Sequence, residues 1–594
     1  MLTRAKGNLA RFCLIALVAA APAAAPRASA ADILANSADD VCPISADPCV
    51  VDERVEVARG SKLDFGTRTV HVTGAGQFAF GLGEATIESG SFIVDAGDGP
   101  AIHSRGRGAS HSRSGTVNIR AFRECELGER QCMGDAGCDL GDCGSRRCAA
   151  NPLRLCEADG DCSNGTCNHH RCSLNLEQRC DSDADCNADT CAPGFTCEGS
   201  GDEPFYCDEN ADCQLGSCSV GEGVIVMNGE IAGSSDKPAV VRMEAYGDIT
   251  FTGDVDLHST GRTGGGTLSL RSRAGGIDFE SDVVCTGTPG GRVQLRSRLD
   301  VDLGGHIDCG GGLIDIATTA TGITSSMRGV TVRSGRDIDV DGTIQVNGME
   351  GARFGGYVHM VAKRDLRISG PGDGPQIETT GILDNNNFSG FGGRQTYETR
   401  RNLNVQESAH FVANGGPNGN GGVVEFGVRG QTLFEGTVSA RVSGHQAFQV
   451  TGGGFFLFGD GPTLFTDDSE IDVSGTAESA GGRLIMDVEA DLELNGLIQS
   501  RGNEPGNNTT FDFRTCNLKI GPDAEIDNNS VGGDNLFKVR EQMTLASGGL
   551  IRTDKGVNEI TYRSDDKKPR LMGNVSPKAV RILDPTLDPC QIEE

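Results

Sequence analysis

The sequence predicts an all-β protein, a right-handed parallel β-helix (β-solenoid) interrupted by one disulfide-rich, loop-rich inserted module. Three observations support this class. Glycine pairs recur along most of the chain, and a short alternating strand follows each pair. Glycine makes up 86 of 594 residues and tryptophan is absent, which is untypical of a helical protein. Sixteen cysteines crowd into one segment where the strand pattern stops.

The glycine-punctuated repeat predicts three short strands in each coil. First strands, polar corners and second strands occur in "GTLSLRSRAGGIDF", "GRVQLRSRLDVDL" and "GRLIMDVEADLEL", and third strands in "GTIQVNG" and "GLIQSRG". Alternation means that one face of each strand is buried, yet strands this short bury too little surface alone. Stacked coils of about 25 residues solve this, and crossovers between parallel strands favour a right-handed winding. The glycines that we expect at the tight or left-handed corners are Gly266, Gly291, Gly312, Gly356, Gly393, Gly422, Gly454 and Gly482.

This repeat resembles the right-handed β-helices of filamentous-haemagglutinin-like secreted proteins of Gram-negative bacteria. The resemblance covers most of the chain and rests on the glycine-strand pattern quoted above. It implies the fold, and it does not imply an activity.

Two columns of polar residues are expected to run along the stacked corners. Seven residues after the glycines stand basic side chains, with Thr319, Gly461 and Glu489 as exceptions: Arg273, Arg298, Lys363, Arg400 and Arg429. Two residues further, acids or amides begin the second strand: Asp300, Asp365, Asn402 and Asp491, with Asp248 and Asp337 in similar contexts. One interpretation is a structural ladder in which Asp and Asn cap turn amides; the other is a basic stripe for an anionic polymer.

Six cysteines outside the inserted segment are disulfide candidates. Cys285 and Cys309 hold matching places in consecutive coils, and stacking places such Cα atoms near 4.8 Å, within disulfide range. Cys42 and Cys49 are expected to join at the amino-terminal end. Cys516 and Cys590 are left to tie down the carboxy-terminal tail.

The inserted segment contains four units of four cysteines, and in every unit the last two cysteine spacings are five and then four residues. This constancy predicts a tandem disulfide module whose connectivity stays open. The units are Cys125, Cys132, Cys138 and Cys143; Cys148, Cys156, Cys162 and Cys167; Cys172, Cys180, Cys186 and Cys191; Cys197, Cys207, Cys213 and Cys218.

The inner motifs "CEADGDC", "CDSDADC" and "CDENADC" resemble the Dickkopf-type amino-terminal cysteine-rich repeat, while "CMGDAGC" departs from it at Gly137. Zinc is a weak alternative because paired C-x2-C knuckles are missing. Asp181, Asp183 and Asp185 alternate like the start of a calcium loop, but no glycine or distal glutamate completes it. We therefore predict no cofactor, with calcium as the weak alternative.

The insertion is expected at a corner between two strands of one coil. "SGTVNIRAFR" precedes it as a first strand, and "GEGVIVMNGEIAG" follows it as a second and third strand. From Cys125 to Cys218 there are 6 basic and 19 acidic residues, a net charge of 6 − 19 = −13.

The amino-terminus predicts export. Residues 1–30 contain Arg4, Lys6 and Arg11, an apolar run and a small-residue cleavage site after Ala30, as in a secretory signal peptide. Cys13 lies within it, so the mature chain would keep 22 cysteines, consistent with an oxidising compartment. No later segment has eighteen consecutive apolar residues, so no membrane span is expected. The net charge of −30 disfavours nucleic acid as a partner.

We expect five regions: the signal peptide at 1–30, an amino-terminal cap with the first coils at 31–122, the cysteine-rich module at 123–220, the main β-helix at 221–575, and a tail at 576–594. No catalytic residue is predicted. "DD" at Asp467 and Asp468 favours a solvated corner, and the other sequence elements of polygalacturonase-like enzymes are missing.

The sequence therefore favours a secreted, non-enzymatic scaffold at the cell surface, in the matrix or in the periplasm of a Gram-negative-type bacterium. Adhesion or recognition of a surface glycan or protein would use the cysteine-rich module. The alternative is a polysaccharide lyase or glycoside hydrolase of the β-helix type. Oligomeric state is left open.

Overall fold

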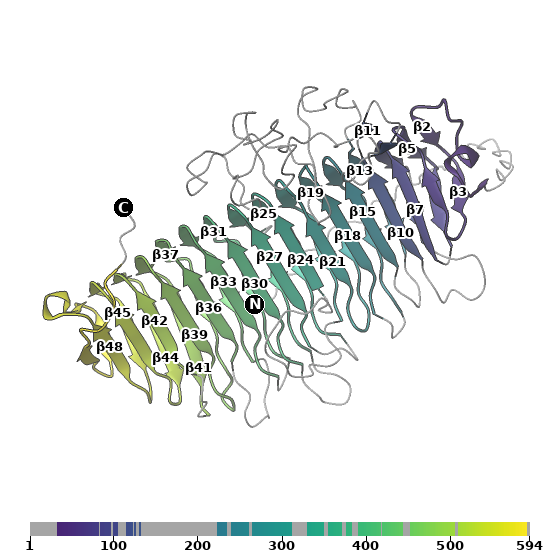
Figure 1. Ribbon diagram of the computed structural model, residues 1–594. Coiled ribbons are helices and arrows are strands. Elements are labelled where there is room, and N and C mark those ends of the chain that lie inside the picture. The colour runs from purple at the N-terminus through teal and green to yellow at the C-terminus, as the bar shows by residue number, and fades with distance from the viewer. Residues whose placement is uncertain are drawn as a thin grey trace, which may run out of the picture.

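The computed structural model describes residues 33–81, 83–96, 99–104, 115–122, 124–125, 130–131, 223–233, 239–260, 264–311, 329–349, 354–370, 376–382, 390–416, 419–442, 452–504 and 509–590. Within these residues the chain forms three long parallel sheets of 17, 16 and 16 strands, here sheets A, B and C. Each coil runs through sheet C, then B, then A, and the next coil pairs with it in parallel. Figure 1 shows the coils stacked side by side from the purple end to the yellow end. The predicted β-solenoid is confirmed.

Sheet C is formed by the first strand of each coil, usually five or six residues long. Its strands are β4 (Lys62–Asp64), β7 (Glu84–Ser89), β10 (Thr116–Ala121), β15 (Val240–Ala245), β18 (Thr267–Ser272), β21 (Arg292–Arg296), β24 (Gly329–Ser334), β27 (Tyr357–Ala362), β30 (Arg394–Thr399), β33 (Val423–Val428), β36 (Gly454–Gly459), β39 (Arg483–Val488), β42 (Phe511–Thr515), β45 (Asn535–Val539), β48 (Asn558–Tyr562) and β51 (Val580–Leu583).

Sheet B is formed by the second strands, most of which have three residues with the outer two buried. They are β2 (Cys49–Val51), β5 (Thr69–Gly74), β8 (Ser91–Ala96), β13 (Ile225–Met227), β16 (Ile249–Phe251), β19 (Ile277–Phe279), β22 (Val301–Leu303), β25 (Ile338–Val340), β28 (Leu366–Ile368), β31 (Leu403–Val405), β34 (Thr432–Phe434), β37 (Thr463–Phe465), β40 (Leu492–Leu494), β43 (Leu518–Ile520), β46 (Met543–Leu545) and β49 (Arg570–Leu571).

Sheet A is formed by the third strands and begins with the first described strand of the chain. Its strands are β1 (Ile33–Ala35), β3 (Arg54–Val57), β6 (Gln77–Phe80), β9 (Pro100–His103), β14 (Glu230–Ala232), β17 (Val255–Asp256), β20 (Val283–Val284), β23 (His306–Asp308), β26 (Thr343–Gln345), β29 (Ile377–Glu378), β32 (His410–Val412), β35 (Thr437–Ser439), β38 (Glu470–Asp472), β41 (Leu497–Gly502), β44 (Glu525–Ser530), β47 (Leu550–Thr553) and β50 (Asn574–Ser576).

Helical structure is slight in the described residues. Two short 3-10 helices occur there, η1 (Ala38–Asp40) and η6 (Asp565–Lys567), near the two ends of the stack. No helix in this part of the chain is long and apolar enough to cross a membrane.

The glycine pairs are explained by close backbone packing. A Cβ on Gly422 would lie 2.1 Å from the carbonyl oxygen of Gly393, and one on Gly482 would lie 2.2 Å from that of Gly453. Neither Gly422 nor Gly482 has a positive φ, so the expected left-handed conformation is not the reason at these corners. Adjacent coils approach too closely there for any side chain.

Two expected boundaries differ from the structure. The strand of sheet C that follows β21 is β24, in which Gly329 pairs with Arg292, whereas the expected start at Gly312 lies outside the described residues. That coil therefore spans 37 residues (329 − 292), whereas the coil before it, from Thr267 to Arg292, spans 25 (292 − 267). The regular glycine spacing predicted the wrong start for this sheet C strand, because a corner can be longer in one coil without disturbing the strands that it joins. The expected tail at 576–594 also begins too early, since β51 pairs with β48 up to Leu583.

The inserted segment joins two strands of a single coil. β10 pairs in register with β7 and β15 over six residues, and β13 pairs with β8 and β16 over three. At the equivalent corner of the preceding coil only Gly90 separates β7 from β8. Within the insertion the structure describes β11 (Glu124–Cys125) and β12 (Arg130–Gln131), a short antiparallel pair. The other features expected there lie outside the described residues.

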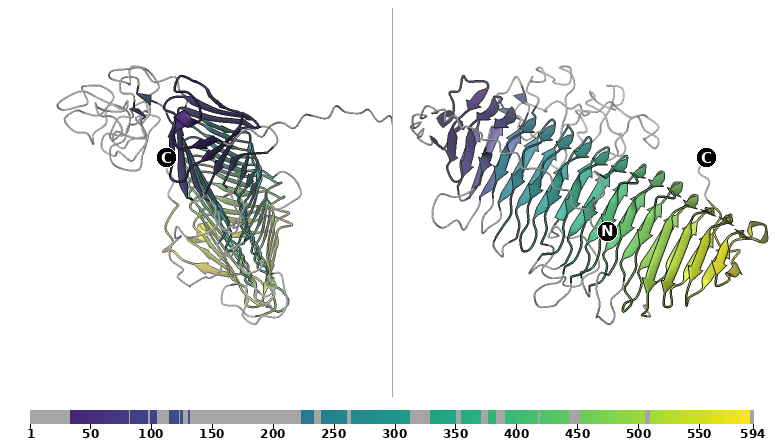
Figure 2. Two further views of the ribbon diagram at one scale, coloured as in Figure 1. Left: turned by 90° about the vertical axis from the view of Figure 1, so that its right-hand side faces the viewer. Right: turned by 180° about the vertical axis from the view of Figure 1, so that it is seen from behind.

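The interior is a continuous apolar column, with an aromatic stack in the middle coils. Tyr397 and Phe426 are stacked at 4.9 Å between ring centroids, Phe455 follows Phe426 at 5.9 Å, and all three are buried. Phe434 and Phe465 form a matching pair on sheet B at 5.0 Å. Figure 2 shows the stack of coils from two other sides.

We expect Phe426→Ala to lower stability by about 3–5 kcal/mol, because it removes a ring from the centre of the stack and leaves a cavity. Phe458→Ala in the next coil is the control, since Phe458 points outward and is 43% exposed. The measurement is the guanidinium midpoint followed by circular dichroism. Equal midpoints for the two variants would contradict the proposed packing role.

Candidate functional site

The polar columns predicted from the sequence meet at the corner between sheets C and B. Asp300 Oδ1 accepts from the Asp337 amide at 3.1 Å, and Asp337 Oδ1 accepts from the Asp365 amide at 2.9 Å. The series continues from Asp365 to the amide of Asn402 at 2.9 Å and from Asn402 to that of Gln431 at 3.0 Å. Asp248 caps Gly276 in the same way at 2.7 Å. For the column of Asp and Asn residues, these contacts agree with the first of the two interpretations, the structural ladder.

Asp491 contributes to the same ladder by a different contact. Its Oδ1 accepts from the side-chain amide of Asn517 at 2.7 Å, and Asn517 Oδ1 then accepts from the Gln542 amide at 3.0 Å. The corner column therefore extends for several more coils.

The basic column is aligned as predicted, with two corrections. The amides of Arg273, Lys363, Arg400 and Arg429 each bond to the carbonyl oxygen at the end of the preceding sheet C strand or next to it. The place expected for Thr319 is taken by Gly335, whose amide bonds to Ser297. Thr319 itself lies outside the described residues.

Triple glycine 452–454 shifts the column by one residue in another coil, so that Asp460 rather than Gly461 follows Arg429. Glu489 comes next, as expected, and forms an ion pair with Arg540 at 2.6 Å. Asp467 and Asp468 lie in an exposed turn between β37 and β38, as expected for a solvated corner.

A second acidic column occupies the outer face of sheet B. Asp278, Asp302 and Asp339 are in register as the middle residues of β19, β22 and β25. Burial is the largest cause raising the pKa of Asp302, and the charges of Asp339, Asp278, Asp300 and Asp341 raise it further. Burial likewise raises the pKa of Asp339, while Arg367 opposes that shift. Burial is the main cause of both shifts, and the like charges of neighbouring aspartates add to it.

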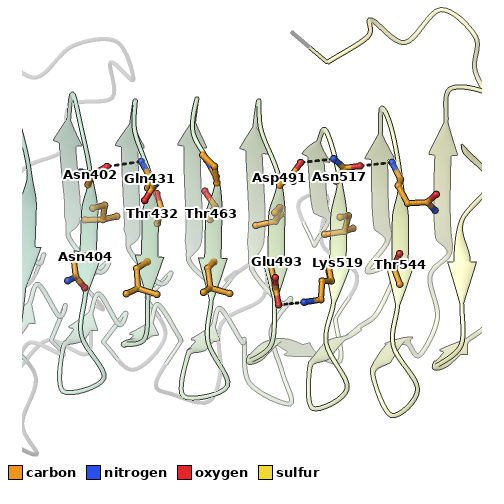
Figure 3. A pocket seen from close by; sticks show the side chains of 17 residues that line it. Asn402, Asn404, Gln431, Thr432, Thr463, Asp491, Glu493, Asn517, Lys519 and Thr544 are labelled. Carbon is orange, nitrogen blue, oxygen red and sulfur yellow. Dashed lines mark hydrogen bonds and ion pairs between the residues drawn. The ribbon is translucent and has the colours of Figure 1, made fainter. Parts of the chain in front are cut away.

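Further along sheet B the outer face is hollowed into a groove of about 830 Å³. One wall is the corner ladder from Asn402 to Gln542, and the floor is the outward column Asn404, Leu433, Leu464, Glu493, Lys519 and Thr544. Figure 3 shows these side chains in successive coils, with Glu493 and Lys519 paired at 2.6 Å. The Lys519 hydrogen bond lowers the pKa of Glu493. The groove crosses successive coils, and its floor has two leucines in the middle with polar side chains on both sides of them.

Three disulfides join the six cysteines expected outside the insertion. Cys285 and Cys309 lie in adjacent coils with Cα atoms 4.5 Å apart. Cys42–Cys49 lies near the amino-terminal end of the stack, and Cys516–Cys590 fastens the carboxy-terminal segment to a corner.

For the insertion, only the backbone of Cys125 is described; its other cysteines and Asp181, Asp183 and Asp185 lie outside the described residues. Within the described part of the chain, no group of three or more His, Cys, Asp or Glu side chains is arranged to hold a metal ion.

Comparison of the chain with protein-family models, with curated proteins and with solved structures finds no match.

Sequence reasoning missed the acidic column and the groove on sheet B. The signal for the first was present, because "GIDFE", "LDVDLG" and "RDIDVD" carry an aspartate at the outward position of each second strand. The groove had no such signal, since its shape depends on the angle between the corner wall and the sheet.

We expect Asp365→Ala to lower stability by about 1 kcal/mol, because the Asn402 amide loses its acceptor. Asp365→Asn keeps an acceptor oxygen without the charge and should retain most of that stability. Denaturant midpoints of the two variants test this. If both lost the same amount, the carboxylate charge rather than its acceptor oxygen would matter.

We expect Asp302→Asn to stabilise the protein at neutral pH. A carboxyl whose pKa is raised on folding favours its protonated form, so its charged form weakens the fold above the folded-state pKa. This penalty disappears as the pH falls through that pKa towards the ordinary value of 3.8. Melting temperatures across this range should show a gain for the variant at pH 7 that shrinks in acid. A gain that persists unchanged into acid would contradict the electrostatic cause.

Proposed function

We propose that the protein is a secreted, non-enzymatic β-solenoid scaffold whose cysteine-rich module, residues 123–220, serves in adhesion or recognition at a cell surface or in a matrix. The observation that carries the proposal is the unbroken register around the insertion. β10 and β13 keep their pairing with the coils on both sides although about a hundred residues separate them in sequence. A stack whose coils contact only their neighbours can carry a module at a corner without changing its core.

The corner residues that would serve a catalytic site have a role in the scaffold. A lyase would need a basic residue beside acidic residues, and Arg298 with Asp300 or Lys363 with Asp365 offers that combination. Asp300 and Asp365 accept backbone N–H groups from the next coil. Their repetition along the stack is the pattern of a structural element and supports the scaffold proposal.

The finer parts of the proposal rest on sequence. The export signal at residues 1–30 and the cysteine content favour secretion to the surface or periplasm of a Gram-negative-type bacterium. The Dickkopf-type resemblance of the module favours recognition of a surface glycan or protein.

The groove on sheet B favours one alternative, a polysaccharide lyase or glycoside hydrolase. It crosses successive coils from Asn402 to Thr544, which suits an extended polymer, and Asp491 and Glu493 line it. Glu493 is held charged by Lys519, which suits a positioning group better than a general acid.

The test compares the full chain with a variant in which a Gly-Ser linker replaces residues 123–220. We expect the variant to keep its circular dichroism spectrum and thermal transition but to lose binding in pull-downs from matrix and cell-surface extracts. Binding that survives the deletion intact would remove the recognition role of the module.

A second arm incubates the full chain with neutral and acidic glycans, with and without calcium, and measures product size. The scaffold proposal expects every chain length to stay unchanged. Cleavage of any glycan would favour the enzyme, and Glu493→Gln, with Glu425→Gln on sheet C as a control, would then test the groove.

A further inference from the structure

Sheet C carries a row of arginines that the fold does not require. The outward residue at or next to the end of each of these strands forms one in-register column: Glu88, Arg120, Glu244, Arg271, Arg296, Arg333, Val361 and Glu398. The first four members alternate in sign. Arg120 contacts Glu88 at 3.4 Å, and Arg271 contacts Glu244 at 3.4 Å. The alternation then fails, and Arg271, Arg296 and Arg333 follow one another.

Three like charges in successive coils oppose stacking. Equivalent residues of adjacent parallel strands lie about 4.8 Å apart, and like charges placed directly opposite are destabilising. In the described part of the chain, neither Arg296 nor Arg333 forms an ion pair with a carboxylate. Glu244 lies at one end of the row, where it contacts Arg271 and Arg273, and Glu398 lies at the other end beside His359.

These arginines line a groove together with basic side chains of the corner. The groove has a volume of about 480 Å³ and lies over β18, β21, β24 and β27, which are neighbours in Figure 1. Its lining includes Arg271, Arg273, Arg296, Arg298, Arg333 and Lys363, against one carboxylate, that of Glu398. Such a concentration of cations stands out in a chain of net charge −30.

The backbone beneath the groove is fixed by inward hydroxyl groups. Ser272 Oγ donates to the carbonyl oxygen of Gly247 at 2.8 Å, and Ser297 Oγ donates to that of Gly275 at 2.8 Å. In the following coil, Ser334 Oγ makes the equivalent contact with the carbonyl oxygen of Leu299. The arginines therefore project from an ordered backbone, so that binding a ligand has to order only their side chains.

We propose that this groove binds an acidic polysaccharide through its carboxylate or sulfate groups. Guanidinium groups bind both oxyanions in bidentate geometry, and a row parallel to the stack axis matches anionic groups repeated along an extended chain. Neutral glycans and single-stranded nucleic acids bind mainly to aromatic platforms. The lining of this groove includes no phenylalanine, tyrosine or tryptophan. The ligand is therefore selected by charge.

The experiment measures binding of the full chain to four probes by biolayer interferometry: dextran sulfate, polygalacturonate, neutral dextran and an oligothymidine strand. The key variant is Arg296→Gln with Arg333→Gln. The matched control is Arg242→Gln with Arg483→Gln, which removes the same charge from exposed positions of sheet C outside the groove.

We expect dextran sulfate or polygalacturonate to bind in a salt-sensitive manner, and the tighter of the two identifies the anionic group. The key variant should bind it about tenfold or more weakly, while the control binds as the parent does. The melting temperature of the key variant should stay equal or rise, because a repulsive contact is removed.

Three results would overturn the proposal. One is that neither acidic glycan binds. Another is that the key variant and the control lose affinity equally, which would indicate a diffuse charge effect. The third is that the oligothymidine strand binds more tightly than both acidic glycans, which would assign the groove to nucleic acid.

Discussion

The structure depends on parallel, in-register pairing between successive coils. This pairing places each residue over the equivalent residue of the next coil. Equivalent side chains of successive coils therefore lie about 4.8 Å apart. An inward phenylalanine therefore meets another apolar residue, as Phe426 meets Phe455. An outward charge meets whatever charge the next coil supplies. The surface side chains consequently form columns, and the environment of each side chain is set by its neighbours in the same column.

The columns differ in how the charges of adjacent coils are compensated. At the corner between sheets C and B, aspartates are stacked directly, yet Asp300, Asp337 and Asp365 each accept a backbone N–H from the following coil. On sheet C the first coils alternate sign, as Glu88, Arg120 and Glu244 do. Asp278, Asp302 and Asp339 on sheet B, and Arg271, Arg296 and Arg333 on sheet C, follow neither rule. These two columns occupy the same coils on neighbouring faces, so an acidic face and a basic face meet at one corner.

Much of the fold was predictable because two sequence patterns, strand alternation and paired glycines, repeat in each coil. Alternation gives the strands, and glycine pairs give the close corners where a Cβ on Gly422 would meet the backbone of the preceding coil. The pairing of Cys285 with Cys309 follows from their equivalent places. The coil start at Gly329 was not predictable from glycine spacing, because the length of a corner is independent of the strands that it joins. The sheet B groove was not predictable either, since the relative orientation of two faces leaves no mark on a strand pattern.

The fold also explains why a long insertion and a regular surface can coexist. In a globular core a hundred inserted residues would have to share contacts with many elements, whereas here β10 and β13 interact mainly with the coils directly above and below. The strand register is therefore the same before and after the insertion. The row of arginines begins with Arg271, two coils further along the stack. Attachment of a module and display of a charged row are thus independent properties of the same corner. A scaffold of this kind can gain or lose either one by changes confined to a few residues of one or two coils.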